Sequence, residues 1–150
     1  MSVLATDPTD RSVADDGAHY RRVLLVEDEV PLRRVVARNL TSRGVQVREA
    51  GTAFEAIQAA ITDPPDLLLL DINLPDQTGW DVLRELKRRG NELPTIVVSA
   101  VRIGQQRLEE FHPLAYLPKP FPIDALLRLV VSGPRNGSEG RLDDDEASPA

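Results

Sequence analysis

The sequence of 150 residues contains no cysteine, no long apolar run and no basic stripe. Without cysteine, a disulfide framework and thiolate chemistry are both excluded. The apolar runs are only a few residues long, far short of the roughly 20 residues that a membrane-spanning helix requires. The lack of clustered basic residues argues against nucleic acid as a partner, and the net charge of −6 argues against an anionic membrane. The first 20 residues have no apolar segment of the kind found in secretory signals, so we expect a cytoplasmic protein.

The acidic residues are concentrated at the two ends of the chain. Residues 1–20 carry four aspartates against one arginine, and residues 133–150 carry five acidic residues against two arginines. Both segments lack hydrophobic periodicity, which is typical of disordered chain. We therefore expect a disordered arm at residues 1–20, one domain at 21–132 and a disordered acidic tail at 133–150.

Between these ends, short apolar runs alternate with segments of helical periodicity. The expected strands lie at residues 23–26, 45–49, 67–70, 96–98 and 114–117, and the expected helices at 30–43, 53–62, 80–89, 103–111 and 122–131. Continuous apolar strands that alternate with amphipathic helices predict a parallel sheet covered on both faces. The fold class is therefore α/β, with a flavodoxin-like, doubly wound sheet of five strands in the order 2-1-3-4-5.

Polar residues stand at the ends of four of these strands. Glu27 and Asp28 follow the first strand, Asp71 the third, Ser99 the fourth and Lys119 the fifth. In the order 2-1-3-4-5 the first and third strands are neighbours, and ligands bind at their carboxyl ends. We therefore expect the three acids to lie together, with the hydroxyl and the amine on the next two strands.

Three carboxylates this close raise one another's pKa unless a cation lies between them. A ligand set made only of oxygen favours Mg²⁺, which binds a few carboxylates, waters and a phosphate oxygen. A metal, a hydroxyl and an ammonium group around one carboxylate are the parts that phosphoryl transfer requires. Asp71 is the best candidate for the nucleophile because it follows a buried strand and lies between the other acids and Lys119.

At this point the sequence resembles a known family, the receiver domains of bacterial two-component response regulators. The resemblance rests on VLLVEDE, on the aspartate, proline and glycine at positions 71, 75 and 79, on PTIVVSA and on YLPKPF. It covers about residues 22–131. It implies a stand-alone signalling switch that is not an enzyme in the usual sense, because it promotes only its own phosphorylation and dephosphorylation. The phosphoryl donor would be a histidine kinase or a histidine phosphotransfer protein, and the output would be altered control of a protein partner.

The resemblance also implies roles for individual residues at the acidic end of the site. Asp71 is similar to the phosphoacceptor and is one of the Mg²⁺ ligands. Asp28 would bind Mg²⁺ directly, Glu27 would bind it through water, and the main-chain carbonyl of Asn73 would complete the metal shell.

The family's switch residues also have counterparts. Ser99 resembles the hydroxyl that closes on the phosphoryl group, and Lys119 the lysine that contacts it. Tyr116 resembles the aromatic residue that turns inward when the hydroxyl moves. The Lys119–Pro120 bond is expected to be cis, as in the family, and proline makes this isomer accessible.

The chain departs from the family pattern between Ser99 and Tyr116. This stretch is slightly short, and His112–Pro113 replaces the usual glycine-alanine turn, so the fourth helix is expected to be short or distorted. Val101 is apolar and cannot orient an attacking water, whereas Asn73 could. Our hypothesis is therefore a phosphoryl group that is not especially short-lived.

Other functions of the same sequence remain open. One is a receiver-fold binding module that is regulated without phosphorylation. Another is a small-molecule phosphatase with an aspartate nucleophile, although such enzymes usually carry a D-x-D pair on the first strand and a cap domain. A flavin binder would need a Ser/Thr-rich phosphate loop after the first strand, which is missing. The downstream target and phosphorylation-dependent dimerisation are not determined by the sequence.

Overall fold

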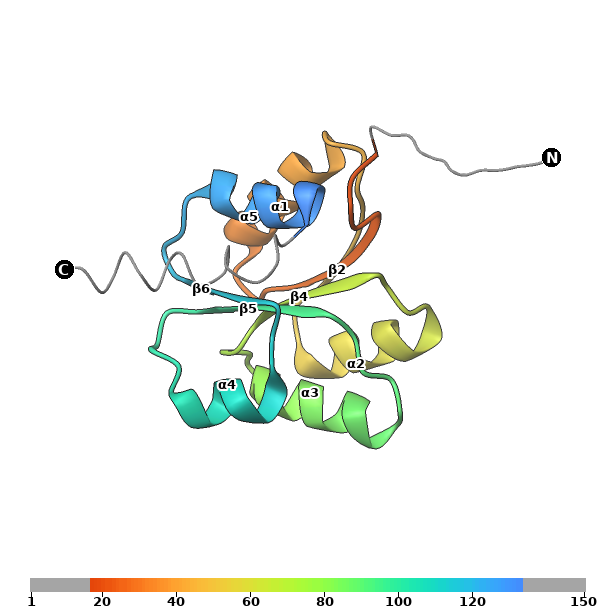
Figure 1. The fold of residues 1–150 in the computed structure, drawn as a ribbon. Coiled ribbons are helices and arrows are strands. Elements are labelled where there is room, and N and C mark those ends of the chain that lie inside the picture. Colours follow the sequence, from red (N-terminus) through yellow and green to blue (C-terminus); the bar gives the residue numbers. More distant parts are fainter. Residues whose placement is uncertain (1–16, 134–150) are drawn as a thin grey trace.

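Strands and helices alternate along the chain in the computed structural model, which describes residues 17–133 (Figure 1). The first half contains β2 (Arg22–Val26), α1 (Val30–Thr41), β3 (Gln46–Ala50), α2 (Ala53–Thr62) and β4 (Leu67–Asp71). The second half contains α3 (Gly79–Arg88), β5 (Thr95–Ser99), α4 (Gln105–Phe111), β6 (Ala115–Pro118) and α5 (Ile123–Ser132). Each strand and helix lies close to the position expected from the hydrophobic pattern.

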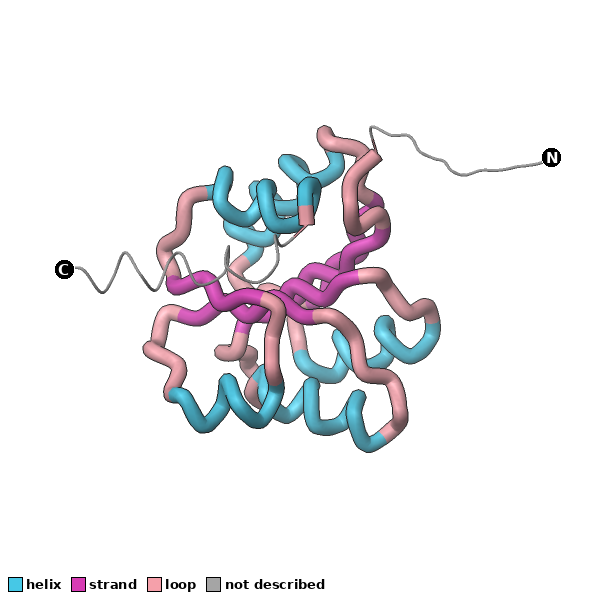
Figure 2. Tube along the Cα trace, viewed as in Figure 1, coloured by secondary structure: helices cyan, strands magenta, loops and turns pink. Residues whose placement is uncertain are grey.

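The five strands form one parallel sheet in the order β3-β2-β4-β5-β6. Counted along the chain this is the predicted order 2-1-3-4-5. Helices α1 and α5 cover one face of the sheet, and α2, α3 and α4 cover the other (Figure 2). Because all strands run the same way, their carboxyl ends lie at one edge, as the sequence analysis predicted.

The side chains of alternate residues on the central strands point into two separate hydrophobic cores. On β2, Leu25 points to the core under α1 and α5, whereas Leu24 points to the core under α2 and α3. All five residues of β4 are buried, which is why its sequence is a continuous leucine run rather than an alternation. Burial on both faces fixes the position of Asp71 at the end of this strand.

Two helices begin at threonine caps. The Thr52 side chain accepts a hydrogen bond from the Glu55 N–H at 3.0 Å, but the Glu55 carboxylate accepts from Gly51 rather than from Thr52. At the start of α3, Thr78 and Asp81 form the full reciprocal capping box. Helix α4 has only 7 residues and buries none of them, so the predicted short fourth helix is confirmed.

The predicted N-terminal arm, residues 1–20, includes four residues, 17–20, that contact the domain in the structure. Ala18 is buried, and the N–H groups of His19 and Tyr20 donate to the carbonyls of Val131 and Val130 at 2.7 and 3.2 Å. Residues 17–20 therefore pack against the last turn of α5 instead of belonging to a disordered arm. The remainder of the predicted arm and the predicted tail beyond residue 133 lie outside the described residues. Within residues 17–133, no helix has the length and apolar character needed to cross a membrane.

Candidate functional site

Three carboxylates meet at the carboxyl edge of the sheet. Glu27 and Asp28 follow β2, and Asp71 is the last residue of the neighbouring strand β4. One oxygen from each of the three lies within 4.8 Å of the others. Glu27 and Asp71 are only 4% and 3% exposed, while Asp28 is exposed to solvent. The structure thus brings together the three acids that the sequence pattern selected.

The Glu27 carboxylate is buried at the end of its strand. Burial raises the pKa of Glu27, and the nearby charge of Asp71 raises it further. Hydrogen bonds from the Glu29 N–H, at 3.1 Å, and from Lys119 act in the opposite direction but do not cancel the effect of burial. A buried acid whose charged form is disfavoured in this way is a group that a bound cation would stabilise.

Lys119 supplies the positive charge of the site. Its Nζ lies 3.0 Å from an oxygen of Asp71, 3.0 Å from an oxygen of Glu27 and 3.6 Å from an oxygen of Glu29. Burial favours the neutral amine, but the hydrogen bonds to Glu27 and Asp71 outweigh it and raise the pKa of Lys119. The Lys119–Pro120 peptide bond is cis, as predicted.

The Ser99 hydroxyl is hydrogen-bonded to the loop that follows β5. It donates to the Val101 carbonyl at 2.8 Å and accepts from the Val101 N–H at 3.0 Å. The hydroxyl of Tyr116 also reaches the Val101 carbonyl, at 3.4 Å, and this side chain is half-buried. The three residues form a small hydrogen-bonded group beside the acidic cluster.

A tight loop after β4 shapes the acceptor side of the site. The Asn73 N–H donates to Asp71 Oδ1 at 3.1 Å, and Asn73 pairs with Thr78 across the loop. Gly79 is required here, because a Cβ at this position would lie 2.8 Å from the Asp71 carbonyl oxygen. In the same loop, Asp76 accepts from the N–H groups of Ala53 and Phe54, which caps α2.

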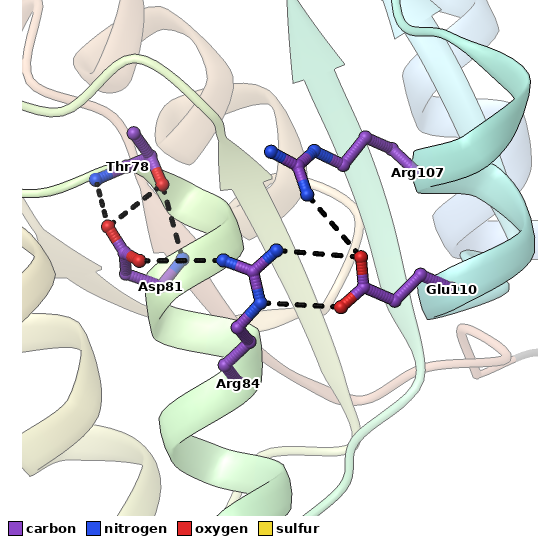
Figure 3. Close-up of polar contacts among 5 residues, drawn as sticks. All are labelled: Thr78, Asp81, Arg84, Arg107 and Glu110. Carbon is purple, nitrogen blue, oxygen red and sulfur yellow. Dashed lines mark hydrogen bonds and ion pairs between the residues drawn. The ribbon is translucent and has the colours of Figure 1, made fainter.

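Helix α4 is attached to α3 beside this loop (Figure 3). Arg84 of α3 forms ion pairs with Asp81 and Glu110. Arg107 of α4 forms an ion pair with the same Glu110 carboxylate. Trp80 stacks on Phe111 with ring centroids 5.0 Å apart. These contacts connect the loop that begins at Asp71 to a helix that buries no residue of its own.

Several residues of the site were not found by sequence reasoning. The Glu29 side chain is exposed to solvent, yet its carboxylate lies within ion-pair distance of Lys119. Arg33 of α1 donates to the main-chain carbonyl of Glu27, and Asp76 caps a helix 23 positions away in sequence. These contacts depend on how loops approach one another, which hydrophobic periodicity does not describe.

Chemically, the arrangement combines an oxygen-only ligand set with the Lys119 ammonium group and the buried Ser99 hydroxyl. The donors of Glu27, Asp28 and Asp71 suit a hard divalent cation such as Mg²⁺. The other carboxylate oxygen of Asp71, Oδ2, accepts a hydrogen bond from Lys119. The lysine ammonium is a compact cation of the kind that binds phosphate oxygens. This donor set fits Mg²⁺ and a phosphate-like group together.

Comparisons with known proteins agree with this geometry. The family model of the response regulator receiver domain matches residues 23–131. The transcriptional regulatory protein KdpE of Mycobacterium tuberculosis is 39% identical over 124 residues, which cover 81% of this chain and 54% of KdpE. The chain thus spans about half the length of this curated relative.

Solved structures show the same fold. The non-phosphorylated HemR receiver domain from Leptospira biflexa is 31% identical, with a TM-score of 0.65 over 71% of this chain and 88% of that chain. The response regulator TrrA from Thermotoga maritima, solved in complex with Mg²⁺ and BeF, is 26% identical. Its TM-score is 0.63, and the match covers 71% of this chain and 92% of that chain.

Proposed function

The chain belongs to the receiver domains of response regulators, and from this premise we propose that Asp71 accepts a phosphoryl group in two-component signalling. The observation that supports this assignment best is the cluster itself. Asp71 is buried at the end of the central strand, with two further acids within 4.8 Å and the Lys119 ammonium at 3.0 Å. A helix cap or a solvated loop acid would need neither of these neighbours.

The metal would be Mg²⁺, held by Glu27, Asp28, Asp71 and the main-chain carbonyl of Asn73. Receiver domains bind Mg²⁺ in an acidic pocket, and TrrA was solved with Mg²⁺ and BeF. When bound, the ion neutralises the charge of the acids and of the incoming phosphate oxygens. The exposed Asp28 and the buried Glu27 would then hold it from the solvent side and from the protein side, respectively.

The transfer step is an in-line displacement at phosphorus. A carboxylate oxygen of Asp71 forms the new P–O bond as the P–N bond of a phosphohistidine breaks, and the histidine nitrogen keeps the electron pair of that bond. Lys119 is placed to stabilise the negative charge on the transferred phosphoryl group, because its Nζ already donates a hydrogen bond to Asp71 Oδ2. The donor in this scheme is a histidine kinase or a histidine phosphotransfer protein.

The phosphoryl group would then act as the ligand of a two-state switch. The Ser99 hydroxyl would leave the Val101 carbonyl for a phosphoryl oxygen, and Tyr116 would lose the loop geometry that holds its hydroxyl outward. Such a switch requires that the phosphoryl group bind one of two existing conformations better than the other. The altered face would control a protein partner, and a phosphorylation-dependent dimer is one form that this control could take.

The phosphoryl group is expected not to be especially short-lived, with a half-life longer than seconds. Val101, whose side chain is 65% exposed beside Ser99, is apolar and offers no group to orient an attacking water. The test is the decay of radiolabelled phosphate from purified protein in Mg²⁺. A half-life of minutes or longer supports the hypothesis, and a half-life of seconds contradicts it.

The assignment of Asp71 is tested by labelling with acetyl phosphate and Mg²⁺, read as the mass gain of one phosphoryl group. The wild-type chain should gain the label, Asp71→Asn should not, and the matched variant Asp124→Asn should behave as wild type because Asp124 is exposed at the start of α5. Labelling of Asp71→Asn at the wild-type level would overturn the proposal. Hydrolysis of a chromogenic phosphate ester by the wild type would favour a phosphatase instead.

A further inference from the structure

Arg33, in the first turns of α1, is bonded to the main chain of the acidic pair. Its Nη1 donates to the Glu27 carbonyl oxygen at 2.9 Å, and its Nε donates to the Glu49 carboxylate at 3.0 Å. The Arg33 side chain is only 20% exposed. One guanidinium group therefore connects α1, the end of β2 and the edge strand β3.

The carbonyl that Arg33 holds lies between the two predicted metal ligands. The Glu27 carbonyl belongs to the peptide unit that joins Glu27 to Asp28, so its orientation determines how both side chains leave the strand. On the other side, the Glu27 N–H donates to the Ala50 carbonyl at 3.0 Å. With both main-chain groups of Glu27 bonded, the peptide plane before Asp28 is fixed.

The chain also makes room for this guanidinium group. Gly51 follows β3, and a Cβ there would lie 2.8 Å from Arg33 Nη1. The nearest atom belongs to the tip of a flexible side chain rather than to the backbone. A small side chain at position 51 would therefore displace the guanidinium from Glu27 without a clash in the main chain.

We propose that Arg33 is a positioning residue for the metal site, and that it acts by fixing the Glu27–Asp28 peptide so that both carboxylates face Asp71. This inference rests on the proposed function, because it assumes that the cluster binds Mg²⁺. Partners that orient metal ligands typically change metal affinity by 10–100-fold when they are removed. Because Arg33 orients main chain rather than a ligand atom, we expect the lower end of that range.

The test is Mg²⁺ affinity measured by isothermal titration calorimetry, with urea unfolding of the same samples as a separate measure of stability. Arg33→Ala should weaken Mg²⁺ binding about tenfold, and Arg33→Lys should recover part of this loss because one ammonium donor can still reach the carbonyl. Gly51→Ala should weaken binding in the same direction while Arg33 itself is retained. Glu49→Gln should keep wild-type affinity, since the bond to Glu27 remains.

Arg34→Ala is the matched control, because Arg34 is the next residue on α1 and is exposed. It should bind Mg²⁺ as the wild type does. If Arg33→Ala and Gly51→Ala both keep wild-type affinity, or if Arg34→Ala loses as much as Arg33→Ala, the inference is wrong. If the wild-type chain itself binds no Mg²⁺, the proposed function fails first, so the two failures can be told apart.

Discussion

Ser99 and Tyr116 donate hydrogen bonds to the same acceptor, the carbonyl oxygen of Val101, at 2.8 and 3.4 Å. The shorter bond comes from a buried hydroxyl, and the longer one is at the weak end of the hydrogen-bond range. One loop carbonyl thus holds both proposed switch residues in the conformation without a phosphoryl group. Any movement of the Ser99 hydroxyl toward Asp71 must give up this bond.

The Ser99 hydroxyl is therefore expected to matter for transfer more than for folding. Ser99→Ala should slow labelling by acetyl phosphate about tenfold, which is less than the 10²–10³ seen for preorganised donors, because this hydroxyl must first rotate. Ser99→Thr keeps a hydroxyl and should label at close to the wild-type rate. Initial rates in saturating Mg²⁺ measure the effect. Equal rates for Ser99→Ala and wild type would exclude the proposed contact.

The buried Glu27 carboxyl should give the metal-free protein a distinctive pH dependence. Burial holds the pKa of Glu27 above its usual value near 4.5, so the folded chain keeps this proton more tightly than the unfolded chain. The resulting stabilisation is present below about pH 4.5 and is lost as the pH rises through the raised pKa. Binding of Mg²⁺ should restore the stability lost at higher pH, because the ion stabilises the charged Glu27 carboxylate.

Glu27→Gln isolates this effect from the other carboxyl groups. In chelator, the free energy of unfolding of Glu27→Gln minus that of the wild type should become more positive as the pH rises above about 4.5. Glu92→Gln, at an exposed position outside the acidic site, is the matched control. A flat difference between Glu27→Gln and the wild type would mean that Glu27 titrates as a solvated acid.

The contact between Trp80 and Phe111 should hold α4 in place. Arg84 lies 5.3 Å from the Phe111 ring centroid and Arg107 lies 5.8 Å from that of Trp80, so the two rings are enclosed by cations. Phe111→Ala should lower the free energy of unfolding by roughly 1–3 kcal/mol, from lost stacking, cation–π contact and burial. It should also abolish slow amide exchange in α4, as measured by hydrogen exchange.

The ion pairs around Glu110 are the control for this prediction. Their side chains are more than 40% exposed, and exposed pairs contribute at most about 1 kcal/mol. Glu110→Gln should therefore cost less than Phe111→Ala in urea unfolding. The reverse order would show that charge, and not the aromatic stack, attaches α4 to α3.

Residues 17–20 are expected to stabilise the domain although the sequence pattern excluded them. A chain that starts at residue 21 loses two main-chain hydrogen bonds to α5 and the packing of Ala18 and Tyr20. Compared with a chain that starts at residue 17, its free energy of unfolding should be about 2–3 kcal/mol lower. Identical urea midpoints for the two chains would show that this segment contributes nothing.

The sequence was sufficient for the sheet because the three central strands, β2, β4 and β5, are largely apolar runs. Leu67–Leu70 cannot be exposed on either face, so β4 had to be central and Asp71 had to stand at the end of a rigid strand. With the strand order known, the meeting of Glu27, Asp28, Asp71 and Lys119 follows from topology alone. The short α4 followed from the missing glycine-alanine turn.

Contacts made by single polar side chains over long sequence distances were not predictable in this way. Residues 17–20 have no periodicity, and they are held by main-chain bonds to the end of α5 that no side-chain pattern signals. No sequence pattern singles out Asp76, yet it caps α2. No sequence pattern singles out Arg33 either, and only the positions of Gly51 and Glu27 around it show what it contacts.

The most direct test of the central claim is a titration with beryllofluoride, a phosphoryl analogue, followed by the backbone amide NMR signals of Asn73, Ser99 and Lys119. We predict saturable shifts of all three signals that require Mg²⁺ and that are absent in Asp71→Asn. Shifts that are unchanged without Mg²⁺, or that persist in Asp71→Asn, would contradict a magnesium-dependent phosphoacceptor site at Asp71.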